Sequence, residues 1–238
     1  MKDLIKAMEE EKKYLSDKFN KIDTNLADRL STYGYSNLKD YFVDKQEYKF
    51  SQIKFNFVEE PMPKGVSEIF NMINTNESGI LFVDWEDTYV VCGNQGIEEF
   101  NQQYCEEHNI TFFPLYTNGG TIVGSIGDFS LGICCPKDIV ENANYILNNI
   151  RAILQKHTSA SVSVDGNDIL VNGNKICGSA SYTKDNMLMV IMHFSFNDWT
   201  DLISNICLTT KKSKPVSYVD FMTREQFKEE VLKWLRKS

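Results

Sequence analysis

The sequence predicts a mixed α/β fold of the α+β class, in which helices pack on a mixed, largely antiparallel β-sheet. The first indication is a pair of turns, Asp165-Gly166-Asn167 and Asn172-Gly173-Asn174, which separate short apolar segments. Turns of this composition are the strongest short-range signals of β-hairpins. The second indication is a long segment at 137–156 whose apolar residues recur at helical spacing. Hairpins mixed with helices favour a largely antiparallel or mixed sheet.

Residues 1–50 differ from the rest of the chain. Apolar residues from Leu4 to Leu30 recur at three-, four- and seven-residue steps, with charged residues between them. This spacing is typical of amphipathic helices. We interpret 1–50 as an N-terminal helical extension, either packed on the main domain or serving as a partner-binding or dimerising arm. The main domain is expected to span 51–238.

Strands and helices follow one another in the main domain. We expect strands at 51–58, 79–83, 89–92, 110–115, 159–164, 168–172, 175–182 and 187–196. We expect helices at 65–75, 96–108, 137–156, 198–206 and 223–236. No long apolar segment suited to crossing a membrane and no secretory signal is visible.

The composition narrows the classes of function. The formal net charge is -8, which argues against broad electrostatic binding to nucleic acid or to an anionic membrane. The six cysteines form no C-x-x-C pair, and half of them lie in apolar segments. Free cysteines of this kind suit a reducing compartment, so we expect a cytoplasmic protein.

Two segments contain residues that folding alone explains poorly. The first runs from Thr117 to Asp128, where glycines between apolar segments allow the backbone to approach a ligand closely. Its candidate binding residues are Asn118, Gly119, Gly120, Thr121 and Asp128. Tight hairpin turns would also explain the glycines, and the segment is not a Walker A loop because no Gly-Lys-Ser/Thr follows.

The second segment places a lysine at the start of an apolar strand, just after a hairpin turn. Strand alternation predicts Lys175, Cys177 and Ser179 on one face. If that face lines a cleft, the ammonium group could face a carboxylate or a phosphate as a compact charge. A solvated lysine at the edge of the sheet is the alternative.

Together, the two segments resemble the lipoate protein ligase family and its octanoyltransferase and biotin ligase relatives. The resemblance depends on Gly119-Gly120, followed some fifty residues later by Gly-x-Lys-Ile-x-Gly-Ser-Ala. Trp85 and the segment 89–96 resemble the family's Trp, apolar strand and Gly-x-x-Gln segment, and 167–171 resembles the strand before the family lysine. The likeness covers about residues 50–237.

The resemblance implies a biotin/lipoate ligase catalytic-domain fold that binds lipoate or a medium-chain acyl group such as octanoate in a tunnel beside the glycine loop. It also implies ATP, with Mg, for activation of the acid, and transfer to a lysine of a small lipoyl-carrier protein or domain. Lys175 matches the catalytic family lysine, and Asp128 stands where the family usually has an asparagine. The further residues that it singles out for substrate binding are Gly178, Ser179 and Ala180, with Asn94, Gln95, Asp168, Cys177 and His193 as possible additions.

Departures from the family pattern leave the mechanism open. The family's glycine loop follows an arginine and contains a His-Asp step, whereas this chain has Gly124-Ser125 there and no Lys, Arg or His between His108 and Lys137. A triphosphate needs several fixed cations. An ATP-independent lipoyl or octanoyl transferase, with Cys177 as a conceivable nucleophile, and a catalytically weakened acyl- or carrier-binding protein are therefore the alternatives. Because few residues follow position 210, we expect the C-terminal accessory domain of many family ligases to be missing.

Overall fold

The computed structural model describes residues 50, 52–93, 100–114, 120–140, 142–208 and 216–237, which belong to one unit, Phe50–Ser238. The predicted N-terminal extension lies outside the described residues, apart from Phe50. Its helices and its boundary therefore remain predictions.

A seven-stranded sheet forms the centre of this unit, with the strand order β1-β2-β6-β10-β9-β8-β7. Its strands are β1 (Asn56–Pro61), β2 (Gly79–Asp84), β6 (Phe129–Pro136), β7 (Val162–Asp165), β8 (Asp168–Val171), β9 (Asn174–Lys184) and β10 (Met187–Phe194). β1 pairs with β2 in parallel, and the other neighbouring strands pair antiparallel. The mixed, largely antiparallel sheet predicted from the sequence is confirmed.

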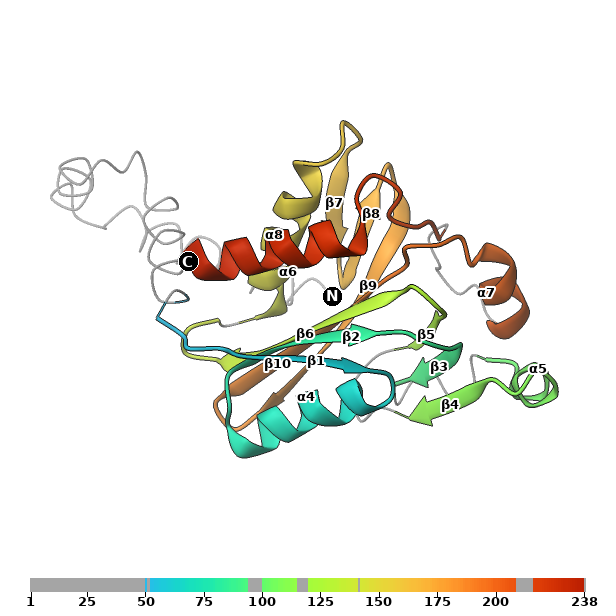
Figure 1. Ribbon diagram of the computed structural model, residues 1–238, viewed down its shortest axis with the longest axis horizontal. Helices are drawn as coiled ribbons and strands as arrows, with labels where there is room; N and C mark the ends of the chain where they lie inside the picture. Colours follow the sequence, from blue (N-terminus) through green and yellow to red (C-terminus); the bar gives the residue numbers. More distant parts are fainter. Residues whose placement is uncertain are drawn as a thin grey trace, which may run out of the picture. The chain divides into compact units, whose positions relative to one another are not determined.

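Helices cover both faces of this sheet (Figure 1). α6 (Ala143–Gln155) and α8 (Arg224–Lys237) lie on one face, and α4 (Lys64–Thr75) lies on the other. β2, β6 and β10 are apolar along nearly their whole length because each must present apolar side chains to both layers. On β2, for example, Ile80 and Phe82 point towards α6 and α8, whereas Leu81 and Val83 point towards α4.

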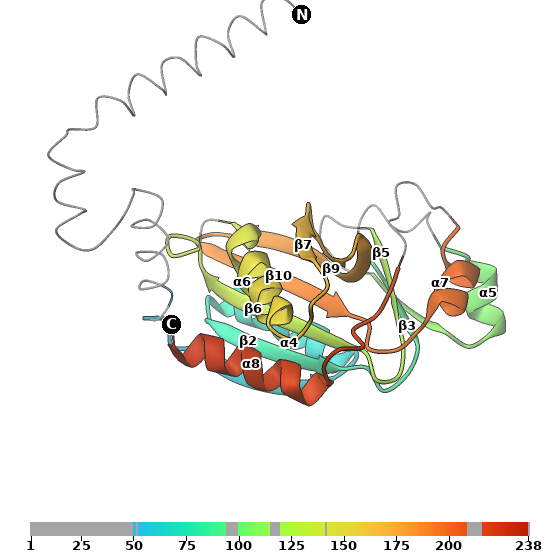
Figure 2. The same cartoon turned by 90° about the horizontal axis from the view of Figure 1, so that it is seen from above.

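A smaller three-stranded sheet packs beside α4. Its order is β4-β3-β5, formed by β3 (Tyr89–Cys92), β4 (Thr111–Pro114) and β5 (Thr121–Gly124). β3 runs parallel to β4 and antiparallel to β5. One face of this sheet contributes Val91 and Ile122 to the apolar layer shared with α4, and the other packs on α5 (Gln102–Glu107) and α7 (Thr200–Ile206). Figure 2 shows α5 and α7 side by side.

Local sequence signals explain several element ends. Asn172 and Gly173 both have positive φ angles, 49° and 82°, as the predicted two-residue turn between β8 and β9 requires. The first turn of α8 has a reciprocal capping box, because the Gln226 backbone N–H donates to Thr223 Oγ1 and the Thr223 backbone N–H donates to Gln226 Oε1. β1 ends at Pro61 on the edge of the sheet, where a residue without an N–H is tolerated.

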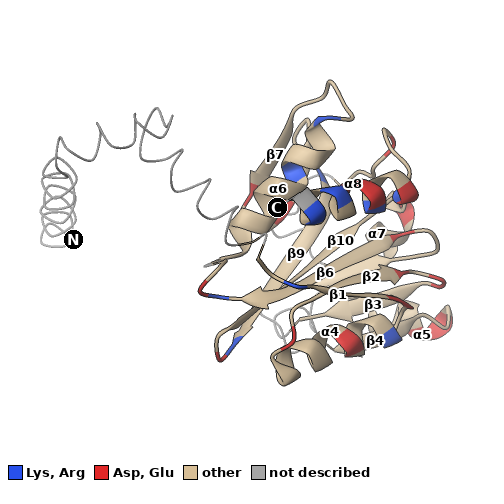
Figure 3. Ribbon diagram, turned by 60° about the vertical axis from the view of Figure 1, so that its left-hand side comes forward, with Lys and Arg blue, Asp and Glu red and all other residues tan. Residues whose placement is uncertain are grey.

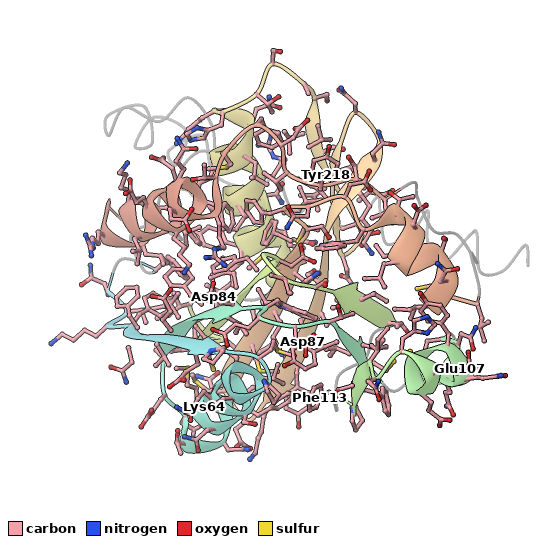
Figure 4. All side chains as sticks on the ribbon, turned by 45° about the vertical axis from the view of Figure 1, so that its right-hand side comes forward. Lys64, Asp84, Asp87, Glu107, Phe113 and Tyr218 are labelled. Carbon is pink, nitrogen blue, oxygen red and sulfur yellow. The ribbon has the colours of Figure 1, made fainter. Side chains whose placement is uncertain are left out.

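Charged residues concentrate on helices, turns and strand ends, and leave the interior of the sheet almost free of charge (Figure 3). Asp84, at the end of β2 and labelled in Figure 4, is bridged to α8 by Arg224 Nη1 at 3.2 Å and Lys228 Nζ at 3.4 Å. These ion pairs attach α8 to the sheet. Within the described part of the chain, no helix has the length and hydrophobicity needed to cross a membrane.

Candidate active site

Lys175 is turned towards a cleft by an irregularity in the pairing of β8 with β9. Leu170 pairs with Lys175 but Ile169 pairs with Cys177, so Ile176 is an extra residue on β9. A β-bulge of this kind interrupts the two-residue alternation of side chains. Ile176 and Cys177 are consequently both buried, whereas the Lys175 side chain is 36% exposed. The predicted shared face of Lys175 and Cys177 was wrong for this reason.

The lysine side chain crosses a glycine to reach its partner. Lys175 Nζ lies 2.8 Å from Asp168 Oδ1, and a Cβ at Gly178 would lie 3.1 Å from both Lys175 Cε and Nζ. Gly178 therefore provides the space through which the ammonium group approaches Asp168. The Asp168 side chain is 23% exposed, so solvent screens this ion pair and its contribution to folding is small, below about 1 kcal/mol.

The ion pair lies in a cleft of about 420 Å³ between β8–β9 and the edge of the small sheet. Of the predicted site residues, Gly120, Thr121, Asp168, Lys175, Gly178, Ser179 and Ala180 line it. Sequence reasoning missed the remaining lining residues, which are Val91, Gly93, Ile122, Asp165, Gly166 and Asn167. Among the described lining residues, Lys175 is the only lysine or arginine and two aspartates accompany it. Asn94, Gln95, Asn118 and Gly119 lie outside the described residues.

Cys177 does not reach the cleft. Its side chain is buried, and desolvation raises the pKa of its thiol far above the usual value, which outweighs the opposing effect of the nearby Lys175 ammonium group. A thiol must be deprotonated to act as a nucleophile. The burial and the raised pKa therefore remove Cys177 as a candidate nucleophile. Burial likewise raises the pKa values of Cys134 and Cys135 to about 12.

Asp128 and His193 form a second polar group away from the cleft lining. Asp128 is fully buried: its Oδ1 accepts hydrogen bonds from the Phe196 backbone N–H and Trp199 Nε1, and its Oδ2 accepts one from the Ser125 backbone N–H. His193 Nε2 lies 3.5 Å from Asp128 Oδ2. The direct contact with substrate expected for Asp128 is therefore not provided by this conformation, in which the carboxylate holds the β5–β6 turn to the chain after β10.

His193 continues this network to two residues that the sequence analysis did not connect with it. Ser130 Oγ lies 3.1 Å from His193 Nδ1 and accepts a hydrogen bond of 2.9 Å from Trp85 Nε1. The strand register places Ser130, His193, Gly178 and Asp168 in one row across β6, β10, β9 and β8. The buried network and the cleft therefore lie on the same face of the sheet, with Gly178 between them.

A small apolar cavity lies beneath the small sheet, next to Ser130 and Trp85. Its volume is about 20 Å³, and Val91 and Ile122 line both this cavity and the larger cleft. These two residues are cross-strand partners on β3 and β5. A polar cleft with a lysine thus adjoins an apolar recess across a single pair of side chains. No cluster of three or more His, Cys, Asp or Glu side chains suited to a metal ion occurs among the described residues.

Comparison with known protein families identifies the family to which this fold belongs. Residues 67–230 match the family described as the lipoyl protein ligase A/B catalytic domain. This match spans well over half of the chain. The chain belongs to this family. The family predicted from the glycine and lysine segments is confirmed. No curated protein sequence matches the chain.

Solved structures show that the family fold is retained at low sequence identity. Plasmodium falciparum LipL1, solved in complex with lipoate, has a TM-score of 0.67 and 16% identity, over 77% of this chain and 62% of that one. The bipartite lipoate protein ligase of Thermoplasma acidophilum, studied with its E2 lipoyl domain, has a TM-score of 0.64 and 16% identity, over 78% of this chain and 84% of that one. A lipoate-protein ligase A structure bound with ATP also has a TM-score of 0.64, at 15% identity, over 78% and 85% of the two chains.

This chain thus spans about three fifths of the length of P. falciparum LipL1.

One sequence signal could have revealed the buried network: Ser130 is a polar residue on a strand that is otherwise apolar and buried. A buried hydroxyl group requires a hydrogen-bond partner. Only the strand register identifies that partner as His193.

Proposed function

We propose that the protein is an acyl ligase of the lipoate-protein ligase type, which attaches lipoate or a medium-chain acyl group to a lysine of a small lipoyl-carrier protein or domain. The observation that carries this proposal is the position of Lys175. Its ammonium group lies at a cleft that adjoins an apolar cavity through Val91 and Ile122. An acid with an apolar chain needs a cation for its carboxyl group and apolar surroundings for its chain, and the cavity of about 20 Å³ has room for the end of that chain.

The sheet register supports a medium-chain substrate. Gly178, across which the Lys175 side chain lies, and Ser130, at the apolar cavity, are separated by two strand spacings. Two such spacings correspond to about 10 Å. An extended chain of about eight carbons, with C–C bonds of about 1.5 Å, has a similar length of about 9 Å. A medium-chain acid with its carboxyl group at Lys175 would therefore be long enough to reach Ser130, provided that it passes His193, which lies between Gly178 and Ser130 in the register.

The chemical role of Lys175 follows from its charge and its support. Attack of the carrier lysine on the acyl carbonyl carbon forms the new C–N bond, breaks the bond to the leaving group and places negative charge on the carbonyl oxygen. Lys175 would stabilise that charge, and Asp168 would keep the ammonium group in place beforehand. The carrier amine must lose a proton in this step, and the carboxylates of Asp165 and Asp168 are the acceptors that line the cleft.

An ATP-independent lipoyl or octanoyl transferase is the second candidate, and the charge of the cleft favours it. Lys175 is the only cation among the described lining residues, and Asp168 already neutralises it. A triphosphate would need more fixed positive donors than this. A transferase that receives its acyl group from another carrier has no such requirement.

The test is an intact-mass assay of a lipoyl-carrier domain incubated with the protein and lipoate or octanoate, with and without ATP and Mg²⁺, and with an octanoyl-carrier thioester as an alternative donor. A mass gain that requires ATP supports the ligase. A gain from the thioester without ATP supports the transferase. Carrier binding without any mass gain would contradict both and indicate an acyl- or carrier-binding protein.

Lys175→Ala should lower the rate of acyl transfer by about a hundredfold or more, because removal of one preorganised donor has effects of about that size. Lys184→Ala is the matched control, since Lys184 lies on the same strand and bonds to Asn74 outside the cleft. Equal rates for the Lys175→Ala and wild-type proteins would refute the role of Lys175.

A further inference from the structure

The buried network determines which ring nitrogen of His193 bears a proton. The Asp128 carboxylate accepts three hydrogen bonds, from two backbone N–H groups and Trp199 Nε1, which compensate its charge although it is fully buried. Because an ionised carboxylate can only accept, the nitrogen that faces it must be the one that carries hydrogen. Within the described structure His193 Nε2 has no closer polar partner than Asp128 Oδ2, at 3.5 Å. Without hydrogen on Nε2, two hydrogen-bond acceptors, His193 Nε2 and Asp128 Oδ2, would face each other, so we assign the Nε2–H tautomer.

We consider the imidazole ring of His193 in its neutral form. In a neutral ring with Nε2 protonated, Nδ1 is an acceptor. Ser130 must then donate its hydroxyl proton to His193 Nδ1, 3.1 Å away.

This hydrogen-bond arrangement determines whether Ser130 offers the apolar cavity a donor or an acceptor. The Ser130 oxygen donates its single proton to His193 and accepts one hydrogen bond from Trp85 Nε1, at 2.9 Å. A hydroxyl oxygen has two lone pairs, so one lone pair remains available. Trp85 has already used its N–H, and Ser130 is the only other residue with a polar side chain among the described residues lining the cavity. The side chains of the described lining residues therefore offer a ligand in the cavity one hydrogen-bond acceptor and no free donor.

We propose that Ser130 is a specificity-determining residue, which recognises an acyl group whose far end carries a hydrogen-bond donor, a hydroxyl or a thiol. The inference rests on the proposed acyl function and deepens it. The cavity of about 20 Å³ has room for a group of the size of one water molecule, which matches a terminal hydroxyl or thiol and not a whole chain. The remainder of the chain would lie along Val91 and Ile122, which line both the cavity and the cleft that contains Lys175.

The test compares the binding of free acids to the full-length protein by titration calorimetry at mildly alkaline pH. Medium-chain ω-hydroxy acids are paired with analogues of equal length in which a methyl group replaces the hydroxyl, and with ω-fluoro analogues, which have no donor. At the chain length that reaches Ser130, the ω-hydroxy acid should bind about fivefold more tightly than either analogue, as expected for one neutral hydrogen bond.

Ser130→Ala should abolish this preference, and Ser130→Thr, which retains the hydroxyl group, should keep it. Ser195→Ala is the control, because Ser195 is a buried serine that does not line the cavity. Thermal melting identifies variants that fail to fold, and the Ser130→Thr protein supplies the comparison if Ser130→Ala does not fold. Equal affinity of the wild-type protein for hydroxy and methyl acids would overturn the role of Ser130 while leaving the acyl site intact. Failure of every acid to bind would overturn the proposed acyl function and this inference with it.

Discussion

Two pairs of a carboxylate and a nitrogen base lie on the same side of the central sheet, yet their surroundings differ. Asp168 and Lys175 meet at 2.8 Å in an open cleft, with about a quarter to a third of each side chain exposed. Asp128 and His193 are 3.5 Å apart and buried, and Asp128 has three further donors. Gly178 lies between the two pairs, because it is the strand partner of His193 on β10 and of Asp168 on β8.

The difference in burial leads us to expect different roles for the two pairs, one in folding stability and the other in function. The buried pair holds the β5–β6 turn, the end of β10 and Trp199 together, so its loss would leave several donors without partners. The side chains of the other pair are 36% and 23% exposed, so water can replace either partner. Asp128 is therefore expected to contribute to folding and Asp168 to the orientation of Lys175.

The largest expected effect is that of Asp128→Ala. Removing the carboxylate leaves the buried backbone N–H of Ser125 and the partly buried backbone N–H of Phe196 and Nε1–H of Trp199 without their acceptor. We expect a loss of about 3 to 5 kcal/mol in the free energy of unfolding, measured by urea denaturation. Asp128→Asn should cost less, because the amide oxygen can still accept from Phe196 and Trp199. A loss below about 1 kcal/mol for Asp128→Ala would show that the buried pair is no more important for folding than a surface ion pair.

The two glycines that face these pairs should respond in opposite ways to alanine. A Cβ at Gly124 would lie 2.6 Å from His193 Cε1 and from the Trp85 ring, and these packed rings cannot move easily. Gly124→Ala should therefore lower the free energy of unfolding by about 2 kcal/mol. At Gly178 the contact is the flexible end of Lys175, so Gly178→Ala should leave stability nearly unchanged.

In Gly178→Ala the added methyl group should instead displace the Lys175 ammonium group. We expect this displacement to lower the rate of acyl transfer to the carrier by about tenfold or more, because a misplaced catalytic group lowers the rate strongly. Urea denaturation and the intact-mass rate are measured on the same two variants. Similar destabilisation of both variants, or full activity of Gly178→Ala, would contradict the assignment of Gly178 as the space for Lys175.

The smallest expected effect on stability is that of Asp168→Asn. The ion pair with Lys175 is partly exposed, so the free energy of unfolding should change by less than about 1 kcal/mol. The rate of carrier acylation should nevertheless fall, with Asp168→Glu restoring part of it, because the lysine loses the partner that orients it. If Asp168→Asn were as destabilising as Asp128→Ala, the distinction between the two pairs would be lost.

Much of the architecture was accessible from local patterns. The hairpin turns at Gly166 and Gly173 and the apolar strands at β2 and β10 follow from residue types at short range, and the structure confirms them. The cleft residues Gly120, Lys175 and Gly178 were identified because glycines and a lysine interrupt apolar segments. Their catalytic and binding roles remain predictions.

The sequence by itself determined the sharp turns, the family and most of the strands and helices, because these depend on residues that tolerate positive φ, on the spacing of motifs and on periodicity. It did not predict β5 and the central strand β6, because glycines interrupt the apolar pattern between Gly119 and Gly132. Tertiary structure alone decided that Cys177 is buried while Lys175 lies at the cleft, since a β-bulge in the pairing with β8 shifts the alternation of side chains. It also decided that Ser130, His193 and Asp128 form one network. Strand register brings together residues up to 65 positions apart, and no local pattern encodes that register.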